Sequence, residues 1–226
     1  MNNLHNLLKE LSPEDALLIE KDFHNFEIYM MMYRSAIKEV TTKLEILSDN
    51  LSVHEGRNPI EMIKSRVKKP KSIIEKLQRK GYEMSIDSVL DKLNDVAGVR
   101  VICSFIKDIY DVADMLCSQD DITVLEVKDY IKNPKPNGYR SYHLIVEIPV
   151  FFADSKRPMR VEVQFRTIAM DFWASLEHQM KYKKDTPNSE EIIKELKNCA
   201  DIIASTDAKM EKINIAISKS QKKKSV

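Results

Sequence analysis

Glycine is scarce in this chain, with four residues among 226: Gly56, Gly81, Gly98 and Gly138. The glycine-rich loops that cradle phosphates in P-loop enzymes, and the GxGxxG turn of dinucleotide-binding folds, are therefore both absent. If the protein binds phosphate, it must use cationic side chains instead of a nest of backbone amides.

Cysteine is also scarce, and apolar runs are short. Cys103, Cys117 and Cys199 stand apart without metal-site spacing, and an odd number of cysteines favours reduced thiols. No run of 18 apolar residues occurs, and the N-terminal sequence MNNLHNLLKELSPED lacks the apolar centre of a signal peptide. We therefore expect a cytoplasmic protein without a membrane span.

Positive charge is concentrated in one stretch, although the net charge is only +1. Residues 64–80, KSRVKKPKSIIEKLQRK, contain eight cations and a single acid, Glu75. A solvated helix face or a non-specific nucleic-acid surface has this composition too. The near-neutral chain and the absence of a recognised RNA-binding motif favour a third interpretation, a site for a compact polyphosphate.

Helical periodicity marks both ends of the chain. Pro13, preceded by Ser12 as the N-cap, starts one long helix, and a second follows Asn188. Each carries apolar residues at alternating three- and four-residue steps, from Phe26 to Leu51 and from Leu196 to Ile217. The two seams pack on each other within the chain or against another subunit, and the pattern alone allows both.

The central part of the chain alternates between strand and helix patterns. Strands are predicted at 98–105, 122–130, 141–152 and 159–167, and helices at 71–80, 86–93, 108–118 and 168–184, with Gly81 and Asp108 as caps. The pattern predicts one α/β domain, α+β-leaning, with a central mixed sheet of about five strands surrounded by helices.

The last predicted strand has two chemically different faces. Val161, Val163 and Phe165 form one face, while Glu162 and Gln164 lie on the other with two arginines. An exposed edge strand has the same alternation. The helix predicted directly afterwards favours a second interpretation, in which it packs back over the sheet and covers a cleft that Glu162 and Gln164 line.

Asp95 stands just before the first predicted strand, in LNDVAGVR. An acid at a strand entrance is often a helix cap or a turn former. Paired in space with Glu162, it could instead hold Mg²⁺, which takes one or two carboxylates and keeps water or phosphate oxygens as its other ligands.

The segment KNPKPNGYRSYHLIVEIPV is more elaborate than a simple turn. Its prolines stiffen the chain and Gly138 permits a tight turn, while Tyr139 offers a flat ring for stacking on a base. Lys135 and His143 are candidates to contact phosphate. The alternative, a tyrosine at the edge of the core, holds for Tyr142, which alternates with apolar residues of the strand.

Four stretches of the chain match one family in order and spacing: DVAGVRVI (95–102), KPNGYRSYH (135–143), VEVQFRT (161–167) and WASLEH (173–178). Over about residues 20–215 the chain resembles the synthetase domain of the RelA/SpoT stringent-response enzymes. Neither their HD hydrolase domain nor their regulatory domains are present in the sequence, as in the stand-alone small alarmone synthetases of the RelP and RelQ types.

The resemblance implies a nucleotidyltransferase-like fold in a single domain, residues 1–226, with a catalytic core at about 55–185. Helices at about 13–52 and 188–219 are then expected to form a homotetramer. The implied reaction transfers the β,γ-pyrophosphate of ATP to the 3′-hydroxyl of GDP or GTP, giving ppGpp or pppGpp and AMP.

The resemblance also implies roles for individual residues. Asp95 and Glu162 match the Mg²⁺ ligands, and Glu162 is in addition a candidate base for the 3′-hydroxyl. The positions matched to ATP are Arg66, Lys68, Lys76, Arg79 and Arg100, of which Arg66 and Arg100 sandwich the adenine. The positions matched to the acceptor are Lys135, Asn137, Tyr139, His143, Gln164 and Arg166, with Tyr139 stacked on the guanine.

Two other functions fit the same motifs. One is a catalytically silent regulator that binds nucleotide or RNA, although the intact Asp95, Glu162 and Tyr139 argue against it. The other is an enzyme that uses this site on ATP or tRNA as acceptor.

Overall fold

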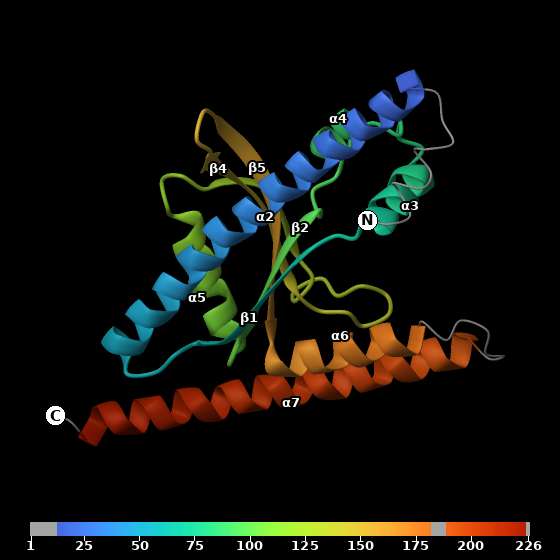
Figure 1. Ribbon diagram of the computed structural model, residues 1–226. Helices are drawn as coiled ribbons and strands as arrows, with labels where there is room; N and C mark the ends of the chain where they lie inside the picture. Colours follow the sequence, from blue (N-terminus) through green and yellow to red (C-terminus); the bar gives the residue numbers. More distant parts are fainter. Residues whose placement is uncertain (1–12, 182–188, 225–226) are drawn as a thin grey trace.

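The computed structural model describes residues 13–181 and 189–224, so Ser12, the expected N-cap, lies outside the described residues (Figure 1). The helices are α2 (Pro13–Glu55), α3 (Pro70–Lys80), α4 (Ile86–Lys92), α5 (Ile106–Cys117), α6 (Ile168–Lys181) and α7 (Ser189–Lys224). The strands are β1 (Ile60–Val67), β2 (Ala97–Cys103), β3 (Thr123–Asp129), β4 (Tyr142–Phe151) and β5 (Lys156–Thr167).

The five strands form one mixed sheet in the order β1-β2-β5-β4-β3, in which β2 and β5 are parallel and the other pairs antiparallel. The predicted fold class is confirmed. Strand β1 has no counterpart among the strands predicted by range, because its burial does not alternate and most of its side chains are exposed. The basic stretch is consequently divided between β1 and α3.

Helices α2 and α5 pack against one face of the sheet (Figure 1). The seam predicted along the first long helix is buried in this layer, with Tyr33, Val40 and Leu44 at most 2% exposed. The α2 seam therefore packs within the chain, as one of the two alternatives predicted, but it packs against the sheet and not against α7. The opposite face of the sheet carries the polar side chains.

Two predicted caps have different outcomes. Gly81 ends α3 in the left-handed conformation, with φ of 67°, as expected. Asp108 is not the N-cap of α5, because the helix begins two residues earlier, at Ile106. Its carboxylate instead accepts a hydrogen bond from the Phe105 amide at 3.2 Å and pairs with Arg57.

Helices α6 and α7 lie side by side at one end of the sheet (Figure 1). Trp173, Ala174 and Ala200 form a small apolar cluster between them, and Tyr139 packs against it from the β3–β4 connection. Within the described ranges, no helix combines the length and the apolar character needed to cross a membrane.

Candidate functional site

The strand register lines up polar residues from different strands on the open face. Residues paired across neighbouring strands share a face and lie next to one another. One such row crosses all five strands as Lys64, Arg100, Gln164, His143 and Lys128. The adjacent row contains Arg66, Gly98 and Glu162. Gly98 carries no side chain, so the sheet is hollowed between Arg66 and Glu162.

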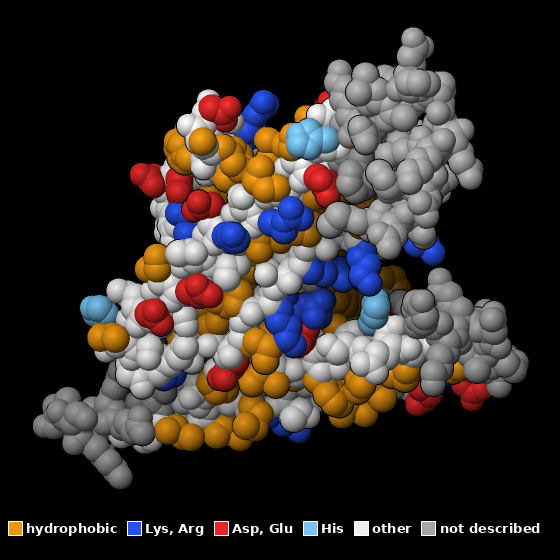
Figure 2. All heavy atoms as spheres, viewed as in Figure 1, with side chains coloured by type: hydrophobic (Ala, Val, Ile, Leu, Met, Phe, Trp, Pro, Cys, Tyr) orange, Lys and Arg blue, Asp and Glu red, His pale blue; other side chains and the backbone are white. Residues whose placement is uncertain are grey.

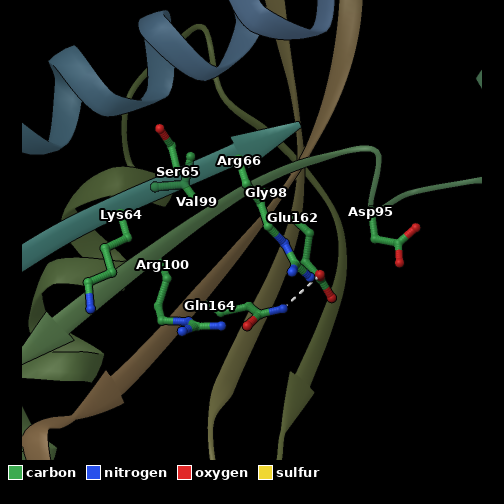
Figure 3. A pocket seen from close by; sticks show the side chains of 9 residues that line it. All are labelled: Lys64, Ser65, Arg66, Asp95, Gly98, Val99, Arg100, Glu162 and Gln164. Carbon is green, nitrogen blue, oxygen red and sulfur yellow. Dashed lines mark hydrogen bonds between the residues drawn. The ribbon is translucent and has the colours of Figure 1, made fainter. Parts of the chain in front are cut away.

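These rows line a cleft made of two adjoining hollows of about 580 Å³ and about 260 Å³. Arg66, Asp95, Arg100, Glu162 and Gln164 border both hollows. In Figure 3 the side chains of Arg66, Arg100 and Glu162 extend into the smaller hollow, and Asp95 stands at its side. Ser65 and Val99 point to the other side of the sheet. Figure 2 shows Lys and Arg side chains gathered around a hollow on this face.

Helix α6 closes one side of the cleft, where Ser175, Glu177 and His178 border the larger hollow. The strand predicted to be either an edge or a cleft wall, β5, is the central strand of the sheet. The interpretation of Glu162 and Gln164 as residues of a covered cleft is therefore the one that the structure supports.

Asp95 is held by two lysines of the basic stretch. Lys68 and Lys76 both contact its Oδ2 atom, at 2.7 Å and 2.8 Å. Burial alone would raise the pKa of Asp95, but the two ammonium groups outweigh it and lower the pKa below its usual value. Its Oδ1 atom is buried and has no hydrogen-bond partner among the described residues. Asp95 is thus an ionised carboxylate with one oxygen left to bind a ligand.

Glu162 lies on β5 with both carboxylate oxygens engaged. Nδ1 of His143 lies 3.1 Å from Oε1, and Nε2 of Gln164 donates to Oε2 at 2.8 Å. Burial would raise the pKa of Glu162, but the contacts with His143 and Gln164 lower it overall. Glu162 is therefore ionised, as both a metal ligand and a base must be.

Tyr139 connects the β3–β4 loop, residues 130–141, to this network. Arg166 donates to its hydroxyl oxygen at 2.9 Å, and the hydroxyl lies 2.8 Å from Nε2 of His143. The contacts fit the tautomer in which Nε2 accepts from the hydroxyl of Tyr139 and the proton on Nδ1 is donated to Glu162. Predicted site residues from the loop, β4 and β5 thus form one continuous chain of hydrogen bonds.

Lys135 lies between two aromatic rings. Its Nζ atom is 5.0 Å from the ring centroid of Tyr139 and 4.6 Å from that of Tyr130. An ammonium ion in this position is attracted to both ring faces. A cation expected to contact phosphate therefore borders the larger hollow, next to the ring expected to stack on a base.

Two arginines of the cleft share one acid that the sequence did not single out. Nη1 of Arg166 and Nη1 of Arg100 lie 2.9 Å and 3.2 Å from Oδ1 of Asp171. Burial, followed by the neighbouring Arg166, lowers the pKa of Arg100. Asp171 lies in the first turn of α6, where an acid is common in any helix, so no sequence signal distinguished it.

Four predicted residues border neither hollow. Lys68 and Lys76 reach the cleft only through their contacts with Asp95, and Asn137 and Arg79 stand further apart. Asn137 donates from Nδ2 to the buried Glu177 at 3.0 Å, and its Oδ1 accepts from the amide of Tyr139. In this arrangement it shapes the loop. Arg79 is exposed in the last turn of α3 and is not among the residues that border either hollow. The role expected for each of them remains a prediction.

The turn that precedes Tyr139 requires glycine. Gly138 has φ of 89°, and a Cβ atom there would lie 2.5 Å from Cβ of Ala200. We expect Gly138→Ala to lower the affinity for the nucleotide predicted to stack on Tyr139 by about tenfold, because both the strained φ and the clash displace the turn. The dissociation constant of the nucleotide, measured at equilibrium for the variant and the wild type, reports this loss of affinity. Gly56→Ala is the matched control, because Gly56 also has a positive φ, of 69°, but a Cβ atom there would meet no other atom within 4 Å.

Comparison with known proteins gives a consistent result. The family model for the region found in RelA/SpoT proteins matches residues 65–187, more than half of the chain. The chain is 44% identical to the GTP pyrophosphokinase YwaC of Bacillus subtilis over 197 residues, covering 87% of this chain and 92% of the relative.

Two solved structures share the fold. The crystal structure of small alarmone synthetase 2 from Bacillus subtilis matches with a TM-score of 0.76 and 45% identity, over 85% of this chain and 99% of that chain. That of small alarmone synthetase 1 from the same organism, bound to its product pppGpp, matches with a TM-score of 0.78 and 34% identity, over 85% and 98%. The family match and the relative at 44% identity together show that this chain belongs to the RelA/SpoT family.

Proposed function

We propose that the chain is a GTP pyrophosphokinase, which transfers the β,γ-pyrophosphate of ATP to the ribose 3′-hydroxyl of GDP or GTP. One observation carries the proposal: the ionised carboxylates of Asp95 and Glu162 border the same cleft as the ring of Tyr139. The GTP pyrophosphokinase activity of YwaC and the pppGpp bound to small alarmone synthetase 1 support the same reaction.

The cations around the cleft suit two polyphosphate substrates. Lys68 and Lys76 approach Asp95 on one side, where we assign ATP, and Arg66 and Arg100 flank the smaller hollow. We assign the acceptor to the other side of Glu162. Its base stacks on Tyr139, and Lys135 borders the same hollow and is available to its phosphates. His143 and Arg166 border this hollow too, but each would have to exchange a hydrogen bond made within the site. Charged donors neutralise the charge that develops during phosphoryl-type transfer.

The donor set fits Mg²⁺. Among the described residues no three acidic, histidine or cysteine side chains cluster as a protein-only metal site. Magnesium suits such a site because it binds one or two carboxylates and takes its other ligands from water and phosphates. Oδ1 of Asp95 is free for this role, whereas Glu162 would exchange its contact with His143 or Gln164. When bound there, Mg²⁺ would supply positive charge that stabilises the charge developing on the phosphates during transfer.

The protein's own part in the reaction is positioning and proton transfer. The 3′-oxygen of the acceptor forms a bond to the β-phosphorus of ATP, and the bond from that phosphorus to the bridging oxygen of the α-phosphate breaks, so AMP leaves. Glu162 takes the hydroxyl proton. His143, hydrogen-bonded between Tyr139 and Glu162, holds that carboxylate in place.

The nature of the acceptor is tested by product analysis. The folded protein is incubated with ATP and Mg²⁺, together with GDP, GTP, excess ATP or tRNA in separate reactions, and AMP and modified acceptor are measured. The proposal predicts AMP only with GDP or GTP. Modified ATP or tRNA would show that the enzyme uses that molecule as its acceptor. Tight RNA binding without turnover would favour a catalytically silent regulator over an enzyme.

The lysines around Asp95 give a pH prediction. Lys76→Met removes one of the two ammonium groups that lower the pKa of Asp95, so this pKa is expected to rise toward its ordinary value. The carboxylate then becomes protonated earlier as the pH falls. We expect the acid side of the activity profile, measured at saturating ATP, to shift to higher pH. Lys80→Met, an exposed lysine of the same helix, is the control and should leave the profile unchanged.

We propose that the homotetramer expected from the resemblance forms through α7. The α2 seam is already buried against the sheet, whereas Met210, Ile213 and Ile217 of the α7 seam are 54%, 54% and 51% exposed. An exposed apolar stripe of this kind is typical of an interaction surface. The variant Met210→Asp with Ile213→Asp is expected to give smaller species in light scattering. A tetramer of unchanged mass would exclude this surface as the interface.

A further inference from the structure

We infer that Ala200, in the first half of α7, is a positioning residue for the β3–β4 loop. The C-terminal helix thereby sets where the ring of Tyr139 stands. This inference rests on the proposed function for the role of Tyr139 but not for the contact itself. Ala200 lies 61 residues beyond Tyr139 in the sequence, yet both belong to one apolar cluster with Trp173.

The backbone turn of the loop rests directly on the helix surface. A Cβ atom at Gly138 would lie 2.5 Å from Cβ of Ala200, 3.4 Å from Cα of Lys197 and 3.6 Å from its carbonyl oxygen. Two positions without bulk therefore face each other, glycine on the loop and alanine on the helix. A larger side chain at either position must move the loop, since protein interiors accommodate added volume by displacement.

Arg140 fastens the other side of the same turn. Its Nη1 atom donates to the carbonyl oxygens of Gly138 at 3.2 Å and Ala200 at 3.4 Å, and Nη2 contacts Oδ1 of Asp201 at 3.1 Å. The guanidinium thus bonds the loop and the helix at once. Tyr139 lies between Gly138 and Arg140, the two anchored residues.

Helix α7 is itself fixed to α6 and to the sheet that carries Glu162. Nε1 of Trp173 donates to the carbonyl oxygen of Leu196 at 2.9 Å. The hydroxyl of Thr167, the last residue of β5, donates to the buried carboxylate of Asp207 at 2.6 Å. Ala200 lies between these two attachment points. The helix therefore relates the loop to the strand that carries Glu162, so that the ring of Tyr139 stands at a defined place relative to the carboxylate.

A bulky residue at position 200 should raise the KM for the acceptor nucleotide and leave the KM for ATP unchanged. Ala200→Leu is expected to push the turn off the helix and raise the acceptor KM by about tenfold or more, because stacking on Tyr139 depends on the position of the ring. The ATP KM and kcat at saturating substrates should stay within about twofold. A general loss of folded enzyme would lower the amount of active protein instead, without changing either KM.

The test combines this kinetic split with hydrogen exchange in the absence of nucleotide. The amides of Lys135 and Gly138 are bonded within the loop, to the carbonyl oxygens of Tyr139 and Lys135. In Ala200→Leu they should exchange about tenfold faster than in the wild type, while β4 and β5 amides stay protected. Ala216→Leu makes the same change at an exposed position of the same helix and should match the wild type in both measurements.

Arg140→Gln is the second variant, because it adds no bulk and removes the three guanidinium contacts. Faster loop exchange with a raised acceptor KM in either variant supports the inference. Unchanged loop exchange in every variant that folds would overturn it, as would an equal rise in both KM values. If the wild type forms no AMP with any guanosine nucleotide, the proposed function fails. Loop exchange then still decides whether Ala200 positions the loop.

Discussion

Glu162→Gln is expected to reduce AMP formation by at least about 100-fold, because general-base catalysis contributes roughly 10²–10⁴-fold and the charge offered to Mg²⁺ is lost as well. The change replaces one carboxylate oxygen by an amide and keeps the shape of the side chain. It also keeps an acceptor for either His143 or Gln164, so the fold should survive. Turnover is measured as AMP released at saturating ATP and GDP.

Glu147→Gln is the matched control for this variant. Glu147 lies on the neighbouring strand β4, where it pairs with Arg160 at 3.9 Å and does not border the catalytic cleft. Its activity should remain within about twofold of the wild type, since a partly exposed ion pair contributes little. If Glu162→Gln keeps more than a tenth of the wild-type rate, Glu162 is not the base and the catalytic role must be reassigned.

Tyr139→Ala is expected to raise the acceptor KM about 5- to 150-fold with a much smaller change in the ATP KM. Stacking of a base on an aromatic side chain contributes about 1–3 kcal/mol, and the loss corresponds to this range of affinity. Steady-state kinetics with each substrate varied in turn measure the effect. A rise in the acceptor KM alone would show that Tyr139 binds the acceptor and not ATP.

Tyr139→Phe divides the contribution of the ring from that of the hydroxyl. Phenylalanine keeps the stacking surface but cannot accept from Arg166 or bond to His143. We expect its acceptor KM to stay near the wild-type value while kcat falls, because His143 loses the partner that fixes its tautomer. An acceptor KM that is unchanged in Tyr139→Ala would contradict the assignment of the base to this ring.

Much of the fold could be predicted because burial leaves a periodic trace in the sequence. The alternation along 159–167 identified β5, and the seam from Phe26 to Leu51 identified α2. The partner of that seam could not be predicted, since an apolar stripe on a helix can pack against a sheet or against another helix. Strand β1 could not be predicted from periodicity, because most of its side chains are exposed and its burial does not alternate.

The site could be predicted residue by residue only through the family motifs. Physical reasoning recognised Asp95 and Glu162 as acids that could share a metal, but their common cleft depends on the register between β2 and β5. The contacts of Asp95 with Lys68 and Lys76 join different elements in the same way. Spacing along the chain does not determine such pairs.

Residues that support the site had still weaker signals. Asp171 resembles any acid in the first turn of a helix, and Ala200 resembles any alanine on a helix. What distinguishes them is the neighbour that folding brings to each: two arginines in one case and the turn at Gly138 in the other.

The central claim is tested most directly by identifying the products formed from ATP and GDP by phosphorus NMR and mass spectrometry. The account predicts AMP and a guanosine nucleotide carrying a new pyrophosphate on its 3′-oxygen, in equal amounts and only with Mg²⁺ present. ADP in place of AMP would mean transfer of a single phosphoryl group. That result, or no modified guanosine nucleotide from the folded protein with either GDP or GTP, would contradict it.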